Sequence, residues 1–399
     1  MATQTRQPYR QKAPIGGASP LQGDSPQDAV EGGAADAPAF ASGGDSDAGF
    51  APARAGQAID RWKRALAEAA PGDFGAVLDE PRTHLTLLKI FGSTNRLSDL
   101  CFKAPAAAAM ALRDGAPSVI AEAARDLADL DGGVGGPDAL HGALEPIKAR
   151  VDLAIAIAEI AGVWSSCEAG AARSDFAERL VETSLKWLLR GGVNRGELTL
   201  DLSDGLASGV FAVAGGDFAH EELSPYGPLD LVVVYDQSIF TGSAASMAER
   251  AFVRLGAELK EVFEGKPGGT PLFALRSPFG AGVNGAGLVE TSARATAALA
   301  DPQQDAVRAF VGVSRIVAGD RAAGGAFLEA SEAAVWASGH ALETLLDARQ
   351  SDDPCADLRR LCDVLRFGIG RSRPVFRTAP AATLLTRAAE AGMIGAPTA

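Results

Sequence analysis

The spacing of apolar residues changes twice along the chain, and this change constrains the fold more than any other feature of the sequence. From Ile59 to about Arg190 apolar residues recur at intervals of three and four, as in KARVDLAIAIAEIAGVW (148–164). This spacing is typical of amphipathic helices that face a core. Near residue 195 it gives way to short, dense apolar runs, and after about residue 304 the helical spacing returns.

Three short runs in the middle of the chain predict buried strands. SGVFAVAGG (208–216), PLDLVVVYD (228–236) and TPLFALRSP (270–278) are rich in Val, Leu and Phe and are bounded by Gly or Pro. A helix is expected between the second and third runs, over residues 243–265, and further helices from DAVRAFVGVSRIVAGD (305–320) onward. The predicted fold class is therefore α+β, mostly helical, with a small mixed sheet flanked by N- and C-terminal helical bundles.

These patterns divide the chain into four predicted parts. Residues 1–57 are rich in Gly, Ala, Ser, Asp and Pro and poor in branched apolar side chains, so ordering them would cost entropy with little burial in return. We therefore expect a disordered tail there. An N-terminal helical domain is predicted over residues 58–190, an α/β core over 191–303 and a C-terminal helical bundle over 304–399.

Charge and composition exclude some classes of partner. The 399 residues include 37 Lys and Arg against 50 Asp and Glu, a net charge of −13, which repels phosphate backbones and anionic lipids. No apolar stretch reaches the roughly 18–20 residues that span a bilayer, and no secretory signal is recognised. The four cysteines lack zinc-ligand spacing, in keeping with reduced thiols. We expect a cytoplasmic protein that binds neither nucleic acid nor membrane.

Several common sites find no support in the sequence. The four histidines lie in separate segments without metal-ligand spacing, and no GxSxG motif marks a nucleophilic serine. GAGVNG (280–285) matches the dinucleotide-binding glycine pattern, but the helix that should begin within that pattern is not predicted. A glycine-rich turn is the favoured interpretation, and a dinucleotide site stays open as the alternative.

Asp230 interrupts an otherwise apolar strand. An ionised carboxylate in such a place is costly unless it faces solvent, a metal ion or a cationic side chain. The loop that precedes the strand begins with Gly215 and Gly216, which allow a backbone to come close to a phosphate. A glycine-bearing loop followed by an acidic strand is typical of nucleotidyltransferases, which hold a triphosphate and its metal ions in this way.

Longer stretches resemble one half of the bacterial glutamine synthetase adenylyltransferase, a family whose full enzyme is a duplication that attaches AMP to glutamine synthetase and removes it. The stretches are LKIFGSTNRLSDLCFKAP (88–105), ARVDLAIAIAEIAGVW (149–164), EELSPYGPLDLVVVYD (221–236), SRIVAGDRAAGGAFL (314–328) and TAPAATLLTRAAEAGMI (378–394). The resemblance covers residues from about 59 to 399 and implies that the core over 191–303 is nucleotidyltransferase-like. It implies ATP or ADP with Mg²⁺ or Mn²⁺ as ligands if activity remains, and glutamine synthetase or a PII-type signalling protein as partner.

The same resemblance assigns the candidate site residues. Asp230 matches a metal-binding catalytic aspartate, Gly215 and Gly216 match the nucleotide loop, and Glu222 matches a glutamate that follows it. Arg276 keeps one arginine role of a later strand after a shift of one residue.

Other family positions have changed their chemistry. Asp217 stands where the family has a lysine, Pro228 replaces the first metal-binding aspartate, and Phe273 and Phe279 stand at acidic positions of the later strand. Two divalent cations need several carboxylates to offset their mutual repulsion, and Asp230 alone does not supply them. We therefore predict a relative that has lost catalysis and works by binding in nitrogen-related control. An active nucleotidyltransferase with a rearranged metal site, and a scaffold unrelated to nitrogen control, stay open as alternatives.

Overall fold

The computed structural model describes residues 52–70, 74–93, 95–130, 135–202, 208–280, 287–301, 303–337 and 354–392. The described residues all fall in one compact unit, Ala48–Ala399. Of the tail predicted over residues 1–57, residues 1–51 lie outside the described part, and α1 begins at Pro52. Most of the GAGVNG stretch, residues 281–285, also lies outside the described part.

Helices fill the described chain up to residue 194, as the apolar spacing predicts. They are α1 (Pro52–Ala69), α2 (Gly75–Leu78), α3 (Pro81–Ser93), α4 (Asn95–Lys103), α5 (Pro105–Asp114), α6 (Ala116–Ala128), α7 (Pro137–Ile160) and α8 (Ser166–Asn194). Trp62 is fully buried among α1, α3 and α4, and its indole N–H donates to the carbonyl of Cys101 at 3.0 Å. α7 contributes to this core through Leu153 and Ile157, and to the core around the sheet through Val151 and Ile155.

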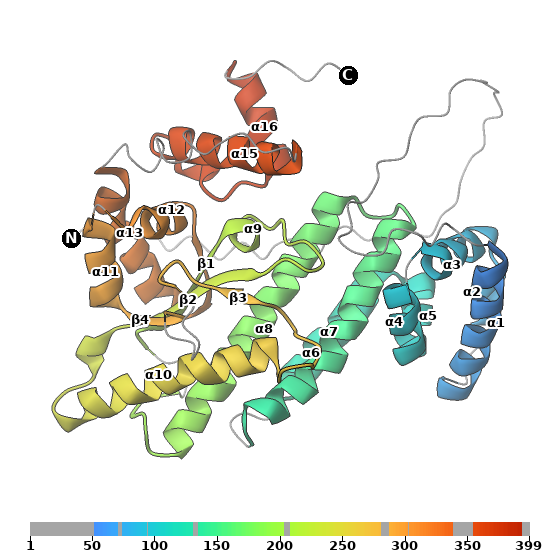
Figure 1. The fold of residues 1–399 in the computed structure, drawn as a ribbon, viewed down its shortest axis with the longest axis horizontal. Coiled ribbons are helices and arrows are strands. Elements are labelled where there is room, and N and C mark those ends of the chain that lie inside the picture. Colours follow the sequence, from blue (N-terminus) through green and yellow to red (C-terminus); the bar gives the residue numbers. More distant parts are fainter. Residues whose placement is uncertain are drawn as a thin grey trace, which may run out of the picture. The chain divides into compact units, whose positions relative to one another are not determined.

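A mixed five-stranded sheet follows α8 (Figure 1). Its strands are β1 (Val210–Gly215), β2 (Leu229–Tyr235), β3 (Leu275–Arg276), β4 (Val289–Thr291) and β5 (Arg315–Gly319). β1 pairs in antiparallel fashion with β2 and β5, whereas β2 pairs in parallel fashion with both β3 and β4. The predicted α+β fold class with a small mixed sheet is confirmed.

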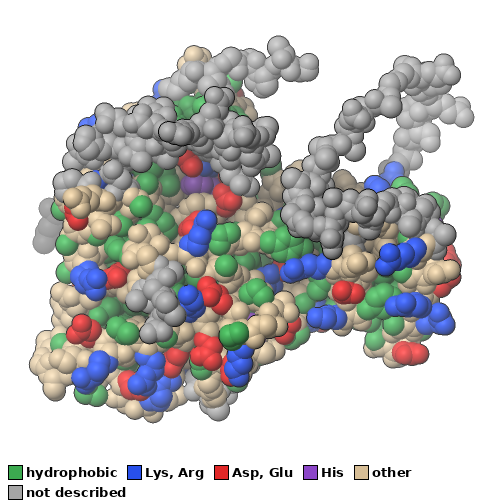
Figure 2. Space-filling view, viewed as in Figure 1, with side chains coloured by type: hydrophobic (Ala, Val, Ile, Leu, Met, Phe, Trp, Pro, Cys, Tyr) green, Lys and Arg blue, Asp and Glu red, His purple; other side chains and the backbone are tan. Residues whose placement is uncertain are grey.

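The remaining elements are helical. They are α9 (Gly216–Ala219), η1 (Gln237–Ile239), α10 (Ser243–Glu264), α11 (Ser292–Ala300), α12 (Asp305–Gly312), α13 (Arg321–Ala337), α15 (Pro354–Gly370), η2 (Pro374–Phe376) and α16 (Ala381–Glu390). Among the described residues no helix has the length and apolar character needed to cross a membrane. On the face shown in Figure 2, Lys and Arg side chains are interspersed with Asp and Glu.

Two local predictions were wrong. The helix expected over residues 305–320 ends at Gly312, and Arg315–Gly319 forms β5 instead. This run is short and apolar, so its period does not distinguish a strand from a helix, and pairing with β1, about a hundred residues earlier, decides its structure. The strand expected over 270–278 is reduced to two paired residues. The sheet thus includes a strand beyond residue 303, and the four predicted domain limits stay predictions.

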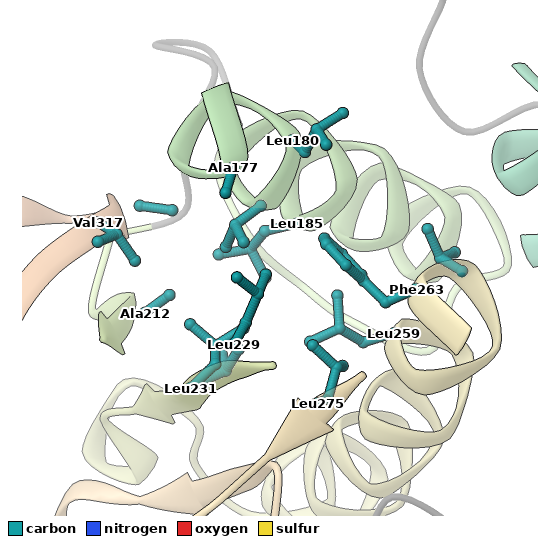
Figure 3. Close-up of a cluster of buried hydrophobic side chains, with 14 of the residues drawn as sticks. Ala177, Leu180, Leu185, Ala212, Leu229, Leu231, Leu259, Phe263, Leu275 and Val317 are labelled. Atoms are coloured by element: carbon teal, nitrogen blue, oxygen red, sulfur yellow. The ribbon is translucent and has the colours of Figure 1, made fainter. Parts of the chain in front are cut away.

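The two faces of the sheet are both covered, and they belong to different cores. Alternate residues such as Ala212, Leu229 and Leu231 pack with α7, α8 and α10 in the largest cluster (Figure 3). The residues between them, including Val213 and Val232, pack in a cluster with side chains of α11, α12 and α13. The second face is the one on which Asp230 lies.

Candidate functional site

Asp230 continues the row of β2 side chains that includes Val234 and Val232. Residues two apart in a strand point to the same face, so this row ends in a carboxylate where the strand begins. Asp230 pairs with Gly215 of β1 on one side and with Arg276 of β3 on the other. The strand register therefore brings together four of the five predicted site residues, because Gly216 follows Gly215 directly.

The carboxylate of Asp230 is bound at both oxygens by Arg276. The guanidinium Nε donates to Oδ1 at 2.8 Å, and Nη2 donates to Oδ2 at 2.7 Å. This two-bond geometry is the strongest that a carboxylate and an arginine can form. The side chain of Asp230 is 20% exposed and that of Arg276 is 62% exposed, so solvent screens the pair on one side.

Both glycines of the predicted phosphate loop are in close contact with other side chains. Gly216 has φ +53°, and a Cβ atom there would lie 2.4 Å from Oδ2 of Asp230. A Cβ atom on Gly215 would lie 2.3 Å from the ring of Phe310 in α12. The absence of a side chain at these positions is thus already required by Asp230 and Phe310.

Glu222 has its partners in the C-terminal helices. Its Oε2 accepts a hydrogen bond from Nη2 of Arg366 in α15 at 3.1 Å, and its Oε1 accepts one from the backbone N–H of Ala381 at the start of α16. The side chain of Arg366 is only 3% exposed, and it also donates to the carbonyl of Ala379. Glu222 therefore joins the site loop to the C-terminal helices, and its role in nucleotide binding stays a prediction.

The segment between Gly216 and β2 is anchored on several sides. Glu221 has φ +61°, which only a well-fixed non-glycine residue adopts. The next residue but one, Leu223, donates its backbone N–H to the Oγ of Ser174 in α8 at 3.2 Å. Arg315 of β5 donates to the carbonyl of Ala219 at 3.1 Å. These contacts fix the loop against α8 and the sheet.

His220 is the buried titratable group of this loop. It is 2% exposed, and within the described part of the chain its Nε2 has no hydrogen-bond partner. Burial and, to a smaller extent, the positive charges of Arg366 and Arg315 lower the pKa of His220 to about 3, although a hydrogen bond with the Val313 backbone opposes the shift. His220 is therefore neutral at pH 7.

Phe273, predicted to stand at an acidic position of the family, does not face the candidate site. Phe273 is buried in the largest core cluster, with the Lys148 ammonium 4.3 Å from its ring centre. It shares the buried face with Leu275, whereas the exposed Ala274 shares a face with Arg276. Ala274 rather than Phe273 therefore lies on the face of Arg276, and the match of Phe273 to an acidic family position stays a prediction.

The donor set does not fit a pair of catalytic metal ions. Among the described residues, no group of three or more His, Cys, Asp or Glu side chains is arranged to hold a metal ion. Asp230 is the carboxylate at the strand end, and Pro228, on the same face, carries no donor side chain. Asp217 and Glu222 lie close enough to Asp363 of α15 to raise the pKa of that carboxyl, after the larger effect of burial.

A mixed sheet with helices on both faces defines the class, an α+β protein, and the candidate site lies at the start of its second strand. Comparison with known sequences goes further. The chain belongs to the glutamate-ammonia ligase adenylyltransferase family, because the family model matches residues 85–304, more than half of the chain. The predicted family is confirmed, and the match includes the Asp230–Arg276 pair.

Curated relatives are bifunctional glutamine synthetase adenylyltransferase/adenylyl-removing enzymes. One from Rhodopseudomonas palustris is 28% identical over 217 residues, which is 53% of this chain and 22% of that enzyme. Another strain's enzyme is 30% identical over 203 residues, 50% of this chain and 18% of the enzyme. The enzyme of Caulobacter vibrioides is 27% identical over 195 residues, which is 48% of this chain and 20% of that enzyme. The matched region thus spans about a fifth of each relative.

Sequence reasoning missed Phe310 and Arg366. Both are distant in sequence from the residues they contact, Gly215 and Glu222. An arginine and a phenylalanine in amphipathic helices carry no local signal of such a role. Only the packing of α12 and α15 identifies them.

Proposed function

We propose that this chain is a non-catalytic member of its family that acts by binding, in control of nitrogen metabolism. The observation that carries the proposal is the ion pair between Asp230 and Arg276, with bonds of 2.8 and 2.7 Å. In nucleotidyl transfer, metal ions held by several carboxylates stabilise the charge that develops on the phosphate. Here the carboxylate at the strand end is neutralised by a side chain.

Glutamine synthetase is the proposed partner. The curated relatives are named for their action on that enzyme. The matched region includes strands β1 to β4 and the long helices α7 and α8, so a binding surface for the same partner can be retained after catalysis is lost. A PII-type signalling protein and a nucleotide are further candidates, and the cytoplasm stays the predicted compartment.

Transfer of labelled AMP tests the loss of catalysis. The full chain is incubated with glutamine synthetase, ATP labelled in its α-phosphate and Mg²⁺ or Mn²⁺, beside a full-length curated relative as positive control. We expect no label on glutamine synthetase with this chain. Label that disappears in Asp230→Asn but persists in Asp236→Asn, a matched change at the other end of β2, would show an active enzyme and end the proposal.

Binding tests the partner. Titration calorimetry with unmodified and AMP-modified glutamine synthetase from the same organism is expected to give a specific complex with at least one form. Tyr226 is exposed on the loop before Asp230, and the guanidinium of Arg96 lies 4.4 Å from the centre of its ring. The double variant Tyr226→Ala, Arg96→Ala removes both groups. No heat of binding with either form of glutamine synthetase rejects it as the partner.

Thermal unfolding tests whether nucleotide still binds. A ligand that binds only the folded state raises the midpoint as its concentration exceeds the dissociation constant. A rise with ATP that is lost in Arg276→Ala would support the predicted nucleotide role of Gly215, Gly216 and Arg276. No rise at millimolar ATP, with or without Mn²⁺, would remove the nucleotide from the candidates.

A further inference from the structure

Arg276 lies beside Asp230 because the strand register puts it there. β2 and β3 run parallel, and Asp230 and Arg276 are paired positions in their ladder. Adjacent strands lie about 4.8 Å apart, so paired side chains on one face are immediate neighbours. The ion pair therefore follows from the backbone arrangement.

Arg276 occupies part of the coordination capacity of the Asp230 carboxylate. An ionised carboxylate offers about four lone-pair directions, and Arg276 occupies one on each oxygen. The backbone of Gly216 also lies close to Oδ2, since a Cβ atom added to that residue would lie 2.4 Å from this oxygen. A divalent cation must displace Arg276 before it can bind both oxygens.

The charges on this face of β2 and β3 balance without a metal ion. Pro228 precedes Asp230 by two residues and Ala274 precedes Arg276 by two, so these four positions share one face. They carry one negative and one positive side chain. A site with further carboxylates at Pro228 and Ala274 would carry a net negative charge and would need cations to offset it.

We infer that Arg276 is a built-in counter-cation that takes the place of a divalent ion at Asp230, so that the folded site is complete without metal and excludes it. The inference rests on the proposed function and deepens it, because it names what stabilises the carboxylate after the catalytic ions are lost. It assigns Arg276 a role that differs from nucleotide binding.

Binding of Mn²⁺ alone to the full chain tests the inference. Free Mn²⁺ is followed by electron paramagnetic resonance during titration of wild type and Asp230→Asn, in which the amide oxygen can still accept from Arg276. We expect the two affinities to agree within about twofold, because Asp230 is not available to the metal. Wild type that binds Mn²⁺ more than about tenfold tighter than Asp230→Asn overturns the inference.

Removal of the arginine gives the second measurement. Arg276→Ala is expected to bind Mn²⁺ at least about threefold tighter than wild type, and the gain should vanish in Arg276→Ala with Asp230→Asn. Arg294→Ala is the matched control, since Arg294 is also exposed and lies 3.4 Å from a carboxylate, that of Glu290. Equal Mn²⁺ binding by Arg276→Ala and wild type counts against the inference, and if Arg276→Ala does not fold, the comparison of wild type with Asp230→Asn decides.

The outcomes separate this inference from the proposed function. Mn²⁺ bound at Asp230 in wild type without transfer of AMP overturns the counter-cation and leaves the non-catalytic binding protein in place. Transfer of AMP that depends on Asp230 overturns the proposed function itself.

Discussion

The two ends of the β1–β2 hairpin are built from the same parts and differ in how their carboxylates are bound. Each end has a glycine with positive φ beside an aspartate. At one end Gly209, φ +75°, lies next to Asp236, and at the other Gly216, φ +53°, lies next to Asp230. Asp230 accepts from a side chain, Arg276, whereas Asp236 accepts from the backbone N–H of Ser238.

The Gly209 end also includes Asp320, whose carboxylate accepts hydrogen bonds from three backbone N–H groups of the described residues. Its Oδ2 accepts from Gly209 at 2.9 Å, and its Oδ1 accepts from Ala322 and Ala323 at the start of α13, both at 3.0 Å. The hydrogen bonds from Ala323 and Gly209 lower the pKa of this carboxyl. Asp320 therefore has a structural role, because its carboxylate binds backbone groups. Asp230 is paired with a side chain instead, so a substitution of its partner can change the chemistry of this position.

The largest expected effect is the loss of Asp320. Asp320→Ala removes the acceptor for three backbone N–H groups, and we expect a loss of about 2–3 kcal/mol in the free energy of unfolding. Urea denaturation measures it. Asp320→Asn keeps an acceptor oxygen at the helix start and should lose clearly less. Equal losses in the two variants would contradict a capping role.

Acid is expected to destabilise the Gly216 end but not the Gly209 end. His220 has its pKa lowered to about 3 in the folded chain, so between pH 6.5 and that value the unfolded chain binds a proton that the folded chain does not. Stability is therefore fully present above pH 6.5 and falls as the pH decreases, by about 2 kcal/mol from pH 7.5 to pH 5. Asp320, with its lowered pKa, stays ionised over this range.

Urea denaturation at several pH values checks this prediction. His220→Gln should lose that part of the pH dependence, whereas His84→Gln, a change at an exposed histidine, should keep it. A pH dependence that is the same in His220→Gln and wild type would show that His220 is not the responsible group.

Alanine at the two glycines compares the ends directly. Both substitutions incur the cost of positive φ, about 1–2 kcal/mol, but the new Cβ atom lies 2.4 Å from Asp230 Oδ2 in one case and 3.3 Å from Asp236 Cβ in the other. Gly216→Ala should therefore cost about 1–2 kcal/mol more than Gly209→Ala. The excess should disappear when Gly216→Ala is combined with Asp230→Ala. An excess that persists would place the strain elsewhere.

The smallest expected effect concerns the link from the Gly216 end to α15 and α16. Glu222→Gln removes the charge that faces the buried Arg366. We expect the free energy of unfolding to fall by about 1 kcal/mol and proteolysis within residues 354–392 to become faster. Glu332→Gln is the matched control, because Glu332 pairs with Arg377 of the same region at 2.6 Å but is 49% exposed. It should lose only about 0.3 kcal/mol.

The sequence predicted the parts of the fold that depend on local pattern. The strands at residues 208–216 and 228–236 were placed within two residues at each end, because dense apolar runs bounded by Gly and Pro are specific. Four of the five candidate site residues lie together for the same reason, since they belong to these runs or to β3. β5 was missed, because its short apolar run becomes a strand only by pairing with β1.

The sequence by itself determined the family, the mostly helical α+β class and the isolation of Asp230 in an apolar strand, because residue types and their spacing carry this information. The tertiary structure alone decided that Arg276 binds both oxygens of Asp230, that Phe310 packs on Gly215 and that Glu222 reaches Arg366. The two hydrogen-bonded pairs join residues that are 46 and 144 positions apart in the sequence. Strand register and helix packing set such distances, and neither is encoded in any local stretch of sequence.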